Sequence, residues 1–186
     1  MGKVIMVTGG ARSGKSTFAE KKTNGIGQSI SYIATAKAID KDMSDRIEKH
    51  KASRPKGWHT FEMYQGFDHL LKDPHFINSD TFLLDCITIM ITNIMFDQDL
   101  DYDTCSLEAI EKVEADIIKV INGLIGLMKE QEKNLIVVTN EVGYGLVPAY
   151  RLGNIFRDIA GRVNQYLAEL SDEVYLVVSG IPVKIK

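Results

Sequence analysis

The sequence predicts an α/β fold, with a mostly parallel sheet and helices on both of its faces. Three observations predict it. Short apolar segments recur along the chain, longer segments with helical periodicity lie between them, and the apolar segments do not alternate with polar residues. Strands that are covered on both faces show such continuous apolar runs, and strands that alternate with helices favour parallel pairing.

Five apolar segments are expected to form strands. They are residues 3–8, 29–34, 81–86, 134–139 and 173–179. Residues 181–186 are expected to add an antiparallel strand at one edge of the sheet. The spacing of the segments does not determine the order of the strands in that sheet.

Four segments between these strands are expected to be helical. Residues 14–23 follow the first strand, and residues 42–52 form a charged segment that ends before Arg54-Pro55, where proline disfavours further helix. Residues 106–131 carry apolar side chains at steps of three and four, with Ser106 as the N-cap. Residues 151–170 form the last helix.

Composition narrows the class of protein. The 186 residues are 45% apolar, which is enough to bury a core, and we expect a single compact α/β domain over residues 1–186. The net charge of −3 disfavours a non-specific nucleic-acid surface and favours small-molecule substrates. Cys86 and Cys105 have no metal-ligand spacing, so neither a metal site with cysteine ligands nor a disulfide framework is expected.

The sequence contains no apolar stretch that favours export or membrane insertion. The N-terminal apolar run is too short for a signal peptide, and no window approaches 18 uninterrupted apolar residues. We therefore expect a cytoplasmic protein without a membrane span.

The strongest motif directly follows the first strand. It matches the phosphate-loop pattern G-x-x-x-x-G-K-[ST] in full, with the residues Gly9, Gly10, Ala11, Arg12, Ser13, Gly14, Lys15 and Ser16. Glycines let backbone N–H groups approach phosphate oxygens, and the following helix adds its N-terminal dipole. Lys15 is expected to reach the outer phosphates and Ser16 to ligate Mg²⁺. The motif predicts a P-loop (RecA-like) NTPase fold; the alternative is a glycine-rich turn without a ligand.

A carboxylate is expected near the same metal ion. The run Phe82-Leu83-Leu84-Asp85 is an apolar strand that ends on an acid, as the second metal ligand of a P-loop enzyme requires. The alternative is an aspartate that only caps the helix beginning at Ile87. Glu141, after the fourth predicted strand, is a weaker candidate for the same metal role.

The charged segment contains a histidine in a cationic setting. Asp42, Arg46 and His50 are four residues apart and share one helical face, and Arg54 follows. Neighbouring cations would lower the pKa of His50 and favour the neutral imidazole, which can act as a nucleophile. From the spacing alone, a solvated helical face is the simpler interpretation.

Motifs spread over most of the chain resemble those of the bifunctional adenosylcobinamide kinase/adenosylcobinamide-phosphate guanylyltransferase family. The shared strings are TGGARSGKS from Thr8, YIATA from Tyr32, RI through HK to RP from Arg46, LDCIT from Leu84, VTNEVG from Val138, FRDIAGRVNQ from Phe156 and VVSG from Val177. The phosphate loop is common to many enzymes, whereas the NEVG and FRDxxGRVNQ strings and the His50 segment are far more specific.

The resemblance implies two reactions in cobalamin assembly. The first phosphorylates adenosylcobinamide with ATP or GTP. The second transfers GMP from GTP to adenosylcobinamide phosphate through a GMP–histidine intermediate, with His50 as the histidine and Lys15 as a further catalytic residue. Some relatives have His-His where this chain has Lys49-His50, and some have Glu where it has Asp85. Mg²⁺ is the implied cofactor, and a homo-oligomer, with a trimer as first choice, is the implied assembly.

The resemblance also implies which residues bind the guanine nucleotide. Beyond the phosphate loop and Asp85 they are Thr35, Ala36, Lys37, Lys51, Ala52, Ser53, Arg54 and Glu62. Five further residues, Asn140, Glu141, Arg157, Asp158 and Asn164, are candidates for corrinoid contacts or for a subunit interface, with an internal Arg157–Asp158 ion pair as the structural alternative.

Two other functions remain open at the level of the sequence. One is a P-loop small-molecule kinase with a single activity, which would form no covalent adduct with GMP. The other is a nucleotide-sensing module. The sequence disfavours it, because it shows no N-K-x-D guanine motif and no appended effector domain.

Overall fold

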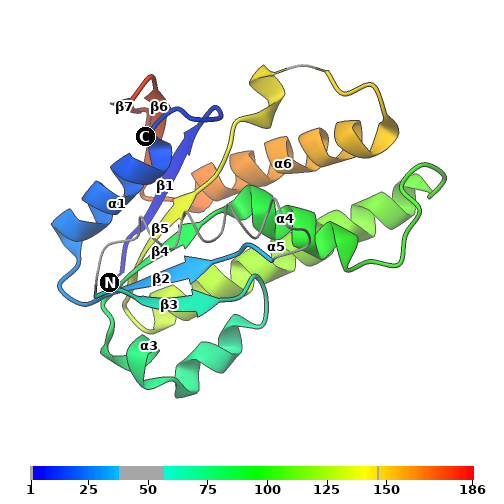
Figure 1. Cartoon of the computed structure of the whole chain (residues 1–186). Helices are drawn as coiled ribbons and strands as arrows, with labels where there is room; N and C mark the ends of the chain where they lie inside the picture. Colours follow the sequence, from blue (N-terminus) through cyan, green and yellow to red (C-terminus); the bar gives the residue numbers. More distant parts are fainter. Residues whose placement is uncertain (1, 38–56, 146) are drawn as a thin grey trace.

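A seven-stranded sheet runs through the molecule (Figure 1). The computed structural model describes residues 2–37, 57–145 and 147–186. In spatial order the strands are β3 (His59–Glu62), β2 (Ile30–Ala34), β4 (Thr81–Asp85), β5 (Asn134–Val138), β1 (Val4–Gly9), β6 (Glu173–Val178) and β7 (Ile181–Lys184). The strands from β3 to β6 pair in parallel, and β7 is antiparallel to β6.

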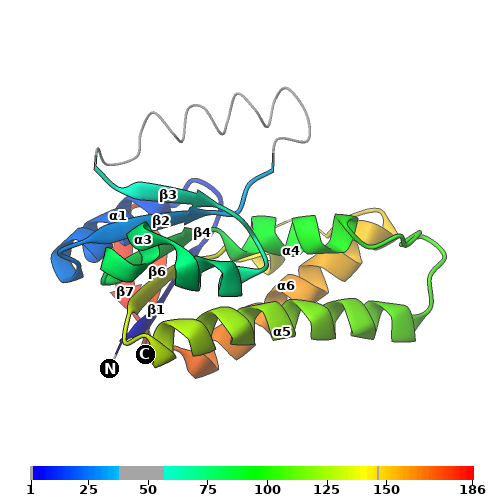
Figure 2. The same cartoon turned by 90° about the horizontal axis from the view of Figure 1, so that it is seen from below.

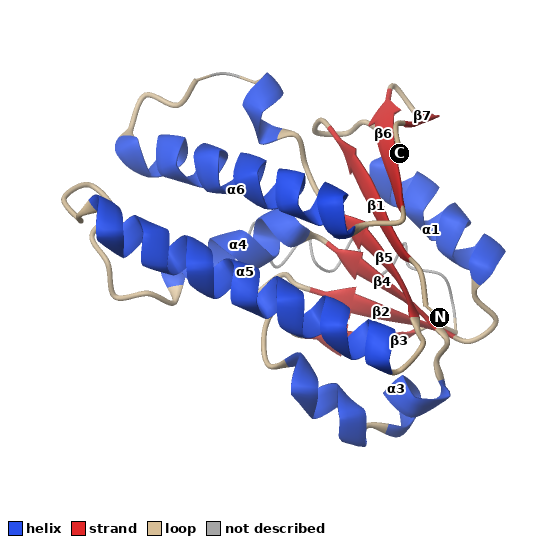
Figure 3. Cartoon of the chain, turned by 180° about the vertical axis from the view of Figure 1, so that it is seen from behind, coloured by secondary structure: helices blue, strands red, loops and turns tan. Residues whose placement is uncertain are grey.

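Helices lie on both faces of this sheet. They are α1 (Lys15–Ile26), α3 (Pro74–Asn78), α4 (Ile87–Phe96), α5 (Leu107–Glu130) and α6 (Arg151–Leu170), with the 3₁₀ helices η1 (Phe67–Lys72) and η2 (Val142–Tyr144). Figure 3 shows α5 and α6 side by side across one face, while α1 packs on the opposite face. The view in Figure 2 separates the same layers, with α5 and α6 below the sheet.

The alternation of side chains along each strand explains the continuous apolar runs of the sequence. In β1, Val4 and Met6 join the core beneath α4, α5 and α6, whereas Ile5 and Val7 join the core beneath α1. Every residue of β1 is therefore buried. A strand with helices on both sides needs apolar side chains at every position, which is why no polar alternation is seen.

The long helix α5 follows directly from its periodicity. Ser106 is its N-cap, and its hydroxyl accepts a hydrogen bond from the backbone N–H of Ala109 at 3.3 Å. Most of the apolar side chains at steps of three and four, among them Ile110, Val113 and Ile117, are buried, whereas Leu107 in the first turn is exposed. The tertiary contacts of this stripe stabilise the helix more than intrinsic propensity does.

Most of the predicted elements are confirmed to within a few residues, including the antiparallel edge strand at the C-terminus. The strand β3 was not predicted. It is four residues long and lies at the sheet edge, and only Phe61 is buried, so it lacks the apolar run that marked the other strands. The predicted helix over residues 42–52 lies outside the described residues.

Two other expectations concern cysteines and membranes. Both cysteines are free; Cys86 is buried, and burial raises the pKa of its thiol, as expected of a structural residue. In the part of the chain that the structure covers, no helix is both long and apolar enough to cross a membrane.

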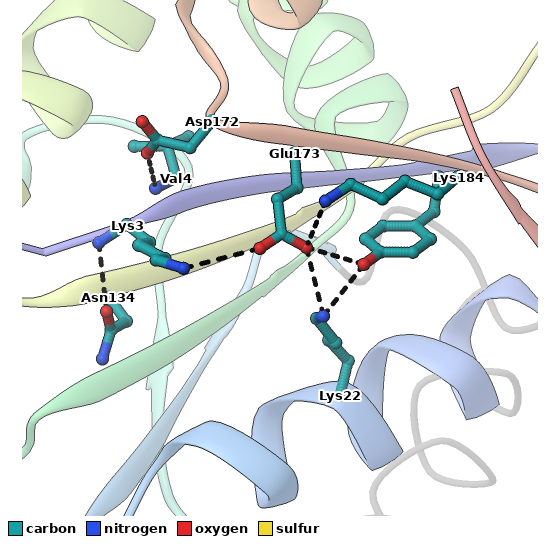
Figure 4. Close-up of polar contacts among 8 residues, drawn as sticks. Lys3, Val4, Lys22, Asn134, Asp172, Glu173 and Lys184 are labelled. Atoms are coloured by element: carbon teal, nitrogen blue, oxygen red, sulfur yellow. Dashed lines mark hydrogen bonds and ion pairs between the residues drawn. The ribbon is translucent and has the colours of Figure 1, made fainter. Parts of the chain in front are cut away.

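A cluster of charges ties α1 to the far edge of the sheet (Figure 4). The carboxylate of Glu173 accepts a hydrogen bond from the Tyr175 hydroxyl at 2.6 Å and lies 3.2 Å from the Nζ of Lys22. The ammonium groups of Lys3 and Lys184 lie 3.6 and 3.5 Å away. The Tyr175 hydrogen bond and then Lys22 and Lys184 lower the pKa of Glu173 from 4.5 to about 2.

This lowered pKa makes part of the stability dependent on pH. Because the carboxylate is favoured in the folded state, its contribution is complete above the unfolded pKa near 4.5 and is lost as the pH falls towards 2.

Glu173→Gln should therefore lower the free energy of unfolding at pH 7 by about 1–2 kcal/mol, allowing for screening by solvent. It should also flatten the loss of stability between pH 4.5 and 2. Urea unfolding across this range, with Glu111→Gln on an exposed face of α5 as control, measures both; equal acid sensitivity of wild type and variant would contradict the assignment.

Candidate nucleotide-binding site

The phosphate loop joins β1 to α1 in the conformation that its glycines require. Gly14 has a left-handed backbone with φ of 90°, and it directly precedes the first residue of α1. A Cβ on Gly9 would lie 2.5 Å from the backbone oxygen of Val177, so only glycine fits there. The loop closes through the N–H of Ser13, which donates to the carbonyl of Gly10 at 3.3 Å.

The turn between β6 and β7 braces this loop from the side. The N–H of Gly180 donates a hydrogen bond to the carbonyl of Ser13 at 2.7 Å. A Cβ on Gly14 would lie 3.1 Å from the Cα of Gly180, so the two backbones are in close contact. The loop is therefore held both by the strand that precedes it and by a hairpin from the end of the chain.

Two side chains of the loop are suited to receive phosphate. The Nζ of Lys15 donates to the carbonyl of Gly10 at 3.2 Å, which holds its ammonium across the loop. The Oγ of Ser13 is buried and has no hydrogen-bond partner among the residues that the structure describes. A buried hydroxyl without a partner costs free energy unless a ligand satisfies it. The loop thus has the cationic and hydrogen-bonding groups that a polyphosphate needs.

The parallel register brings further polar residues to the same edge of the sheet. Asp85 at the end of β4 is level with Val138 of β5, and Val138 is level with Val7 of β1. Asp85 is therefore about 10 Å from β1, two strand spacings away. Its half-buried carboxylate makes no hydrogen bond or ion pair with any residue that the structure covers, which leaves it available to a ligand.

Thr35, at the end of β2, has a structural role that the sequence did not indicate. Its buried hydroxyl accepts a hydrogen bond from the N–H of Cys86 at 2.9 Å and donates one to the carbonyl of Cys86 at 2.8 Å. Its own carbonyl accepts a hydrogen bond from the Nδ2 of Asn93 at 2.6 Å. The Thr35 side chain thus fastens the end of β2 to the residue after Asp85, and its hydroxyl is occupied.

Three further predicted nucleotide contacts, Ala36, Lys37 and Glu62, lie at the same edge of the sheet. Ala36 and Lys37 follow Thr35, and the exposed Glu62 ends β3 level with Ala34. The Nζ of Lys37 forms an ion pair with Asp97 at 3.0 Å, and the Tyr64 hydroxyl donates to the same carboxylate at 2.6 Å. The Lys37 ammonium is thus bound to the end of α4.

The predicted residues His50, Lys51, Ala52, Ser53 and Arg54 lie outside the described residues. Arg157 and Asp158 form an ion pair with Nε and Oδ1 3.5 Å apart. Corrinoid contacts or a subunit interface stay predictions for these two residues.

A pocket of about 570 Å³ opens beside the phosphate loop. Gly10 and Ala11 form one wall, and Thr88, Asn140 and Glu141 bring polar groups to it. The remaining lining residues, Val142, Tyr144, Gly145 and Phe156, are mainly apolar. Sequence reasoning had singled out Asn140 and Glu141 but not Thr8 and Thr88, which hold them in place. The signal that could have found Thr8 is a threonine at the end of the apolar strand before the phosphate loop. The signal for Thr88 is a threonine at the start of α4, the helix after Asp85.

Comparison with known proteins agrees with this geometry. Residues 5–185 match the family model described as cobinamide kinase / cobinamide phosphate guanyltransferase. The chain belongs to this family. It is 47% identical to the bifunctional adenosylcobalamin biosynthesis protein CobU of Escherichia coli strain K12, over 98% of this chain and 99% of that protein.

Two further relatives agree. The Salmonella typhimurium protein of the same name is 45% identical, over 98% of this chain and 99% of that protein. The bifunctional adenosylcobalamin biosynthesis protein CobP of Pseudomonas aeruginosa is 34% identical, over 97% and 96%.

Two solved structures are similar at a much lower level. They are the flagellar accessory protein FlaH from Methanocaldococcus jannaschii and the KaiC-like protein PH0186 from Pyrococcus horikoshii OT3, at 14% and 16% identity. Both have a TM-score of 0.45 and cover 94% of this chain, which spans 70% of each of them. At this level of similarity neither structure informs the function of the chain.

The Thr35 contacts predict a structural phenotype. Thr35→Val removes the hydroxyl and leaves the N–H and carbonyl of Cys86 without these partners inside the protein, so it should lower the free energy of unfolding by about 1–3 kcal/mol. Thr35→Ser keeps the hydroxyl and should lose less than about 1 kcal/mol. Denaturant unfolding of both variants provides the measurement. Equal stability of the valine and serine variants would show that these hydrogen bonds contribute nothing.

Proposed function

We propose that the chain phosphorylates the hydroxyl of adenosylcobinamide with ATP or GTP, and then transfers GMP from GTP to the resulting phosphate. The observation that carries the proposal is the family match over residues 5–185 in a chain whose phosphate loop is complete and braced. The products are adenosylcobinamide phosphate in the first reaction, and adenosylcobinamide-GDP with pyrophosphate in the second.

The loop residues support the kinase step through positioning and charge. The N–H groups at the start of α1 and the ammonium of Lys15 face the place where the phosphates would lie. Phosphoryl transfer needs little covalent work by the protein, because its charge develops on the phosphate oxygens. Donors fixed in advance stabilise that charge without reorganisation.

The guanylyl transfer needs a nucleophile, and we propose His50 for it. A neutral imidazole nitrogen attacks the α-phosphorus of GTP, the bond to the bridging oxygen breaks, and pyrophosphate leaves. An oxygen of adenosylcobinamide phosphate then attacks the same phosphorus and releases the imidazole. Two displacements at a good nucleophile and leaving group replace one difficult step.

Ser16 and Asp85 are proposed to hold Mg²⁺. Oxygen ligands suit this ion, which is bound in nucleotide enzymes through one or two protein groups, with phosphates and water completing its six ligands. The described ranges contain no cluster of three or more His, Cys, Asp or Glu that could hold a metal. The proposed Mg²⁺ site therefore has only two protein ligands. The ion would supply charge neutralisation on the phosphates.

We also propose that the protein assembles as a homo-oligomer, with a trimer as first choice, and that it acts in the cytoplasm, where ATP and GTP are available. Exposed apolar side chains on α5 and at the start of α6, such as Leu107 and Tyr150, are consistent with an interface. Sedimentation equilibrium determines the stoichiometry.

The covalent intermediate provides the first functional test. Incubation with GTP labelled at the α-phosphate should leave label on the protein that is labile to acid and stable to base. His50→Ala should abolish this label while retaining much of the kinase activity, and His69→Ala, at an exposed position in η1, should label as wild type does. Undiminished labelling of the His50 variant would reject this acceptor, and a wild type that transfers γ-phosphate without any label would indicate a kinase of single activity.

The metal proposal is tested by the dependence on Mg²⁺. Asp85→Asn removes the charge of a metal-binding oxygen, so the Mg²⁺ concentration for half-maximal activity should rise by roughly tenfold or more. Titration of both reactions with Mg²⁺ measures it. The same Mg²⁺ dependence in variant and wild type would remove Asp85 from the site.

A further inference from the structure

The residues at the end of β5 form a connected polar group that the nucleotide site does not use. We call Thr139, Asn140 and Glu141 the β5 end. It lies between the phosphate loop and Asp85, because β5 is the strand between β1 and β4.

Glu141 is held against the start of the loop by its backbone and by one carboxylate oxygen. Its N–H donates to the carbonyl of Gly9 at 3.1 Å. Its Oε1 accepts hydrogen bonds from the Thr8 hydroxyl at 2.7 Å and from the Nδ2 of Asn164 at 3.4 Å. Its Oε2 accepts no hydrogen bond from any residue in the described parts of the chain. One oxygen is thus fixed, and the other is free to accept a proton.

Asn164 orients the β5 end from α6. Its side chain is buried, with 6% exposed. Its Oδ1 accepts a hydrogen bond from the Thr139 hydroxyl at 2.7 Å, and its Nδ2 also donates to the carbonyl of Asn140 at 3.0 Å. These contacts assign the orientation of the Asn164 amide, whose nitrogen donates both to the Asn140 carbonyl and to Glu141. The Asn164 amide is therefore already oriented when it donates its hydrogen bond to Glu141.

Two further polar groups of the pocket, the Asn140 amide nitrogen and the Thr88 hydroxyl, are hydrogen-bonded to each other. The Nδ2 of Asn140 donates to the Thr88 hydroxyl at 2.6 Å, and that hydroxyl lies 3.1 Å from the Sγ of Cys86. Among the described residues that line the pocket, Glu141 carries the one carboxylate. A carboxylate next to a triphosphate repels it, so Glu141 is poorly suited to bind the nucleotide itself. It is well suited to accept a proton from a neutral alcohol that is to receive the phosphoryl group.

We propose that this pocket binds the arm of the acceptor that carries the alcohol, and that Glu141 is the general base of the kinase step. The inference rests on the proposed function and deepens it. Oε2 of Glu141 takes the proton of the acceptor hydroxyl, and the hydroxyl oxygen forms a bond to the γ-phosphorus. The bond from that phosphorus to the β–γ bridging oxygen breaks, and the nucleoside diphosphate leaves with the electron pair.

The apolar part of the pocket fits the rest of such an acceptor. Val142 and Phe156 are half-buried there, and Tyr144 has 77% of its surface exposed. An exposed aromatic side chain at the rim provides contact area for a large, partly apolar ligand. The pocket thus pairs a proton acceptor at the loop with an apolar surface further out.

The test measures the kinase reaction and the guanylyl transfer separately in the folded protein. Glu141→Gln keeps an oxygen for Thr8 but cannot accept the proton, so kcat for phosphorylation of adenosylcobinamide should fall by roughly 10²–10⁴-fold. The Kd for GTP and the label from α-phosphate-labelled GTP should not change. Guanylyl transfer to adenosylcobinamide phosphate supplied directly should stay within about threefold of wild type, because that acceptor no longer has the alcohol.

Two further variants complete the experiment. Glu130→Gln, at the exposed end of α5, is the matched control and should leave both reactions unchanged. Tyr144→Ala should raise KM for adenosylcobinamide by roughly 5–10-fold without changing KM for GTP, because it removes ligand contact only.

Three outcomes would overturn the inference. Glu141→Gln with the kcat of wild type removes the general base, and equal loss of both reactions would show that Glu141 serves the fold or the nucleotide. Unchanged KM for adenosylcobinamide in Tyr144→Ala would place the acceptor elsewhere. If the wild type phosphorylates no adenosylcobinamide, the proposed function itself fails, which is visible before any variant is compared.

Discussion

The parallel register of β1, β5 and β4 is the constraint on which the site depends. Because these strands run in the same direction, their carboxyl ends meet at one edge, and loops that are far apart in sequence begin within two strand spacings of each other. The phosphate loop follows β1, the polar group of Glu141 follows β5, and Asp85 ends β4. No long-range charge attraction is needed to assemble these groups, since main-chain hydrogen bonds already do so.

Buried hydrogen bonds then fix the direction of the side chains at this edge. Thr35 satisfies both main-chain groups of Cys86, and Asn164 connects Thr139, Asn140 and Glu141. Such groups add little net stability when they are paired, but leaving one unpaired costs about 1–3 kcal/mol. Alternative orientations of the edge are therefore disfavoured, and the site is organised before a ligand arrives.

Sequence reasoning located the sheet, its main helices and the phosphate loop, because each depends on local patterns. The continuous apolar runs predict buried strands, and the octapeptide from Gly9 to Ser16 predicts its own backbone conformation. It missed β3, whose single buried residue, Phe61, leaves no periodic signal. The nucleotide contacts of Thr35 and Lys37 stay predictions, and no sequence pattern indicated that the Thr35 hydroxyl pairs with Cys86 and the Lys37 ammonium with Asp97. These partners are 51 and 60 residues away along the chain, so no local pattern reveals them.

The hydrogen bond from Gly180 to Ser13 has a consequence for the order in which the phosphate loop becomes rigid. The octapeptide and the hairpin that braces it are far apart along the chain, so the brace forms only when β6 and β7 have joined the sheet. A fragment that contains the octapeptide but lacks β6 and β7 would carry the whole motif without the strand and turn that hold it. The conformation of this short motif therefore depends on tertiary structure as well as on its own glycines.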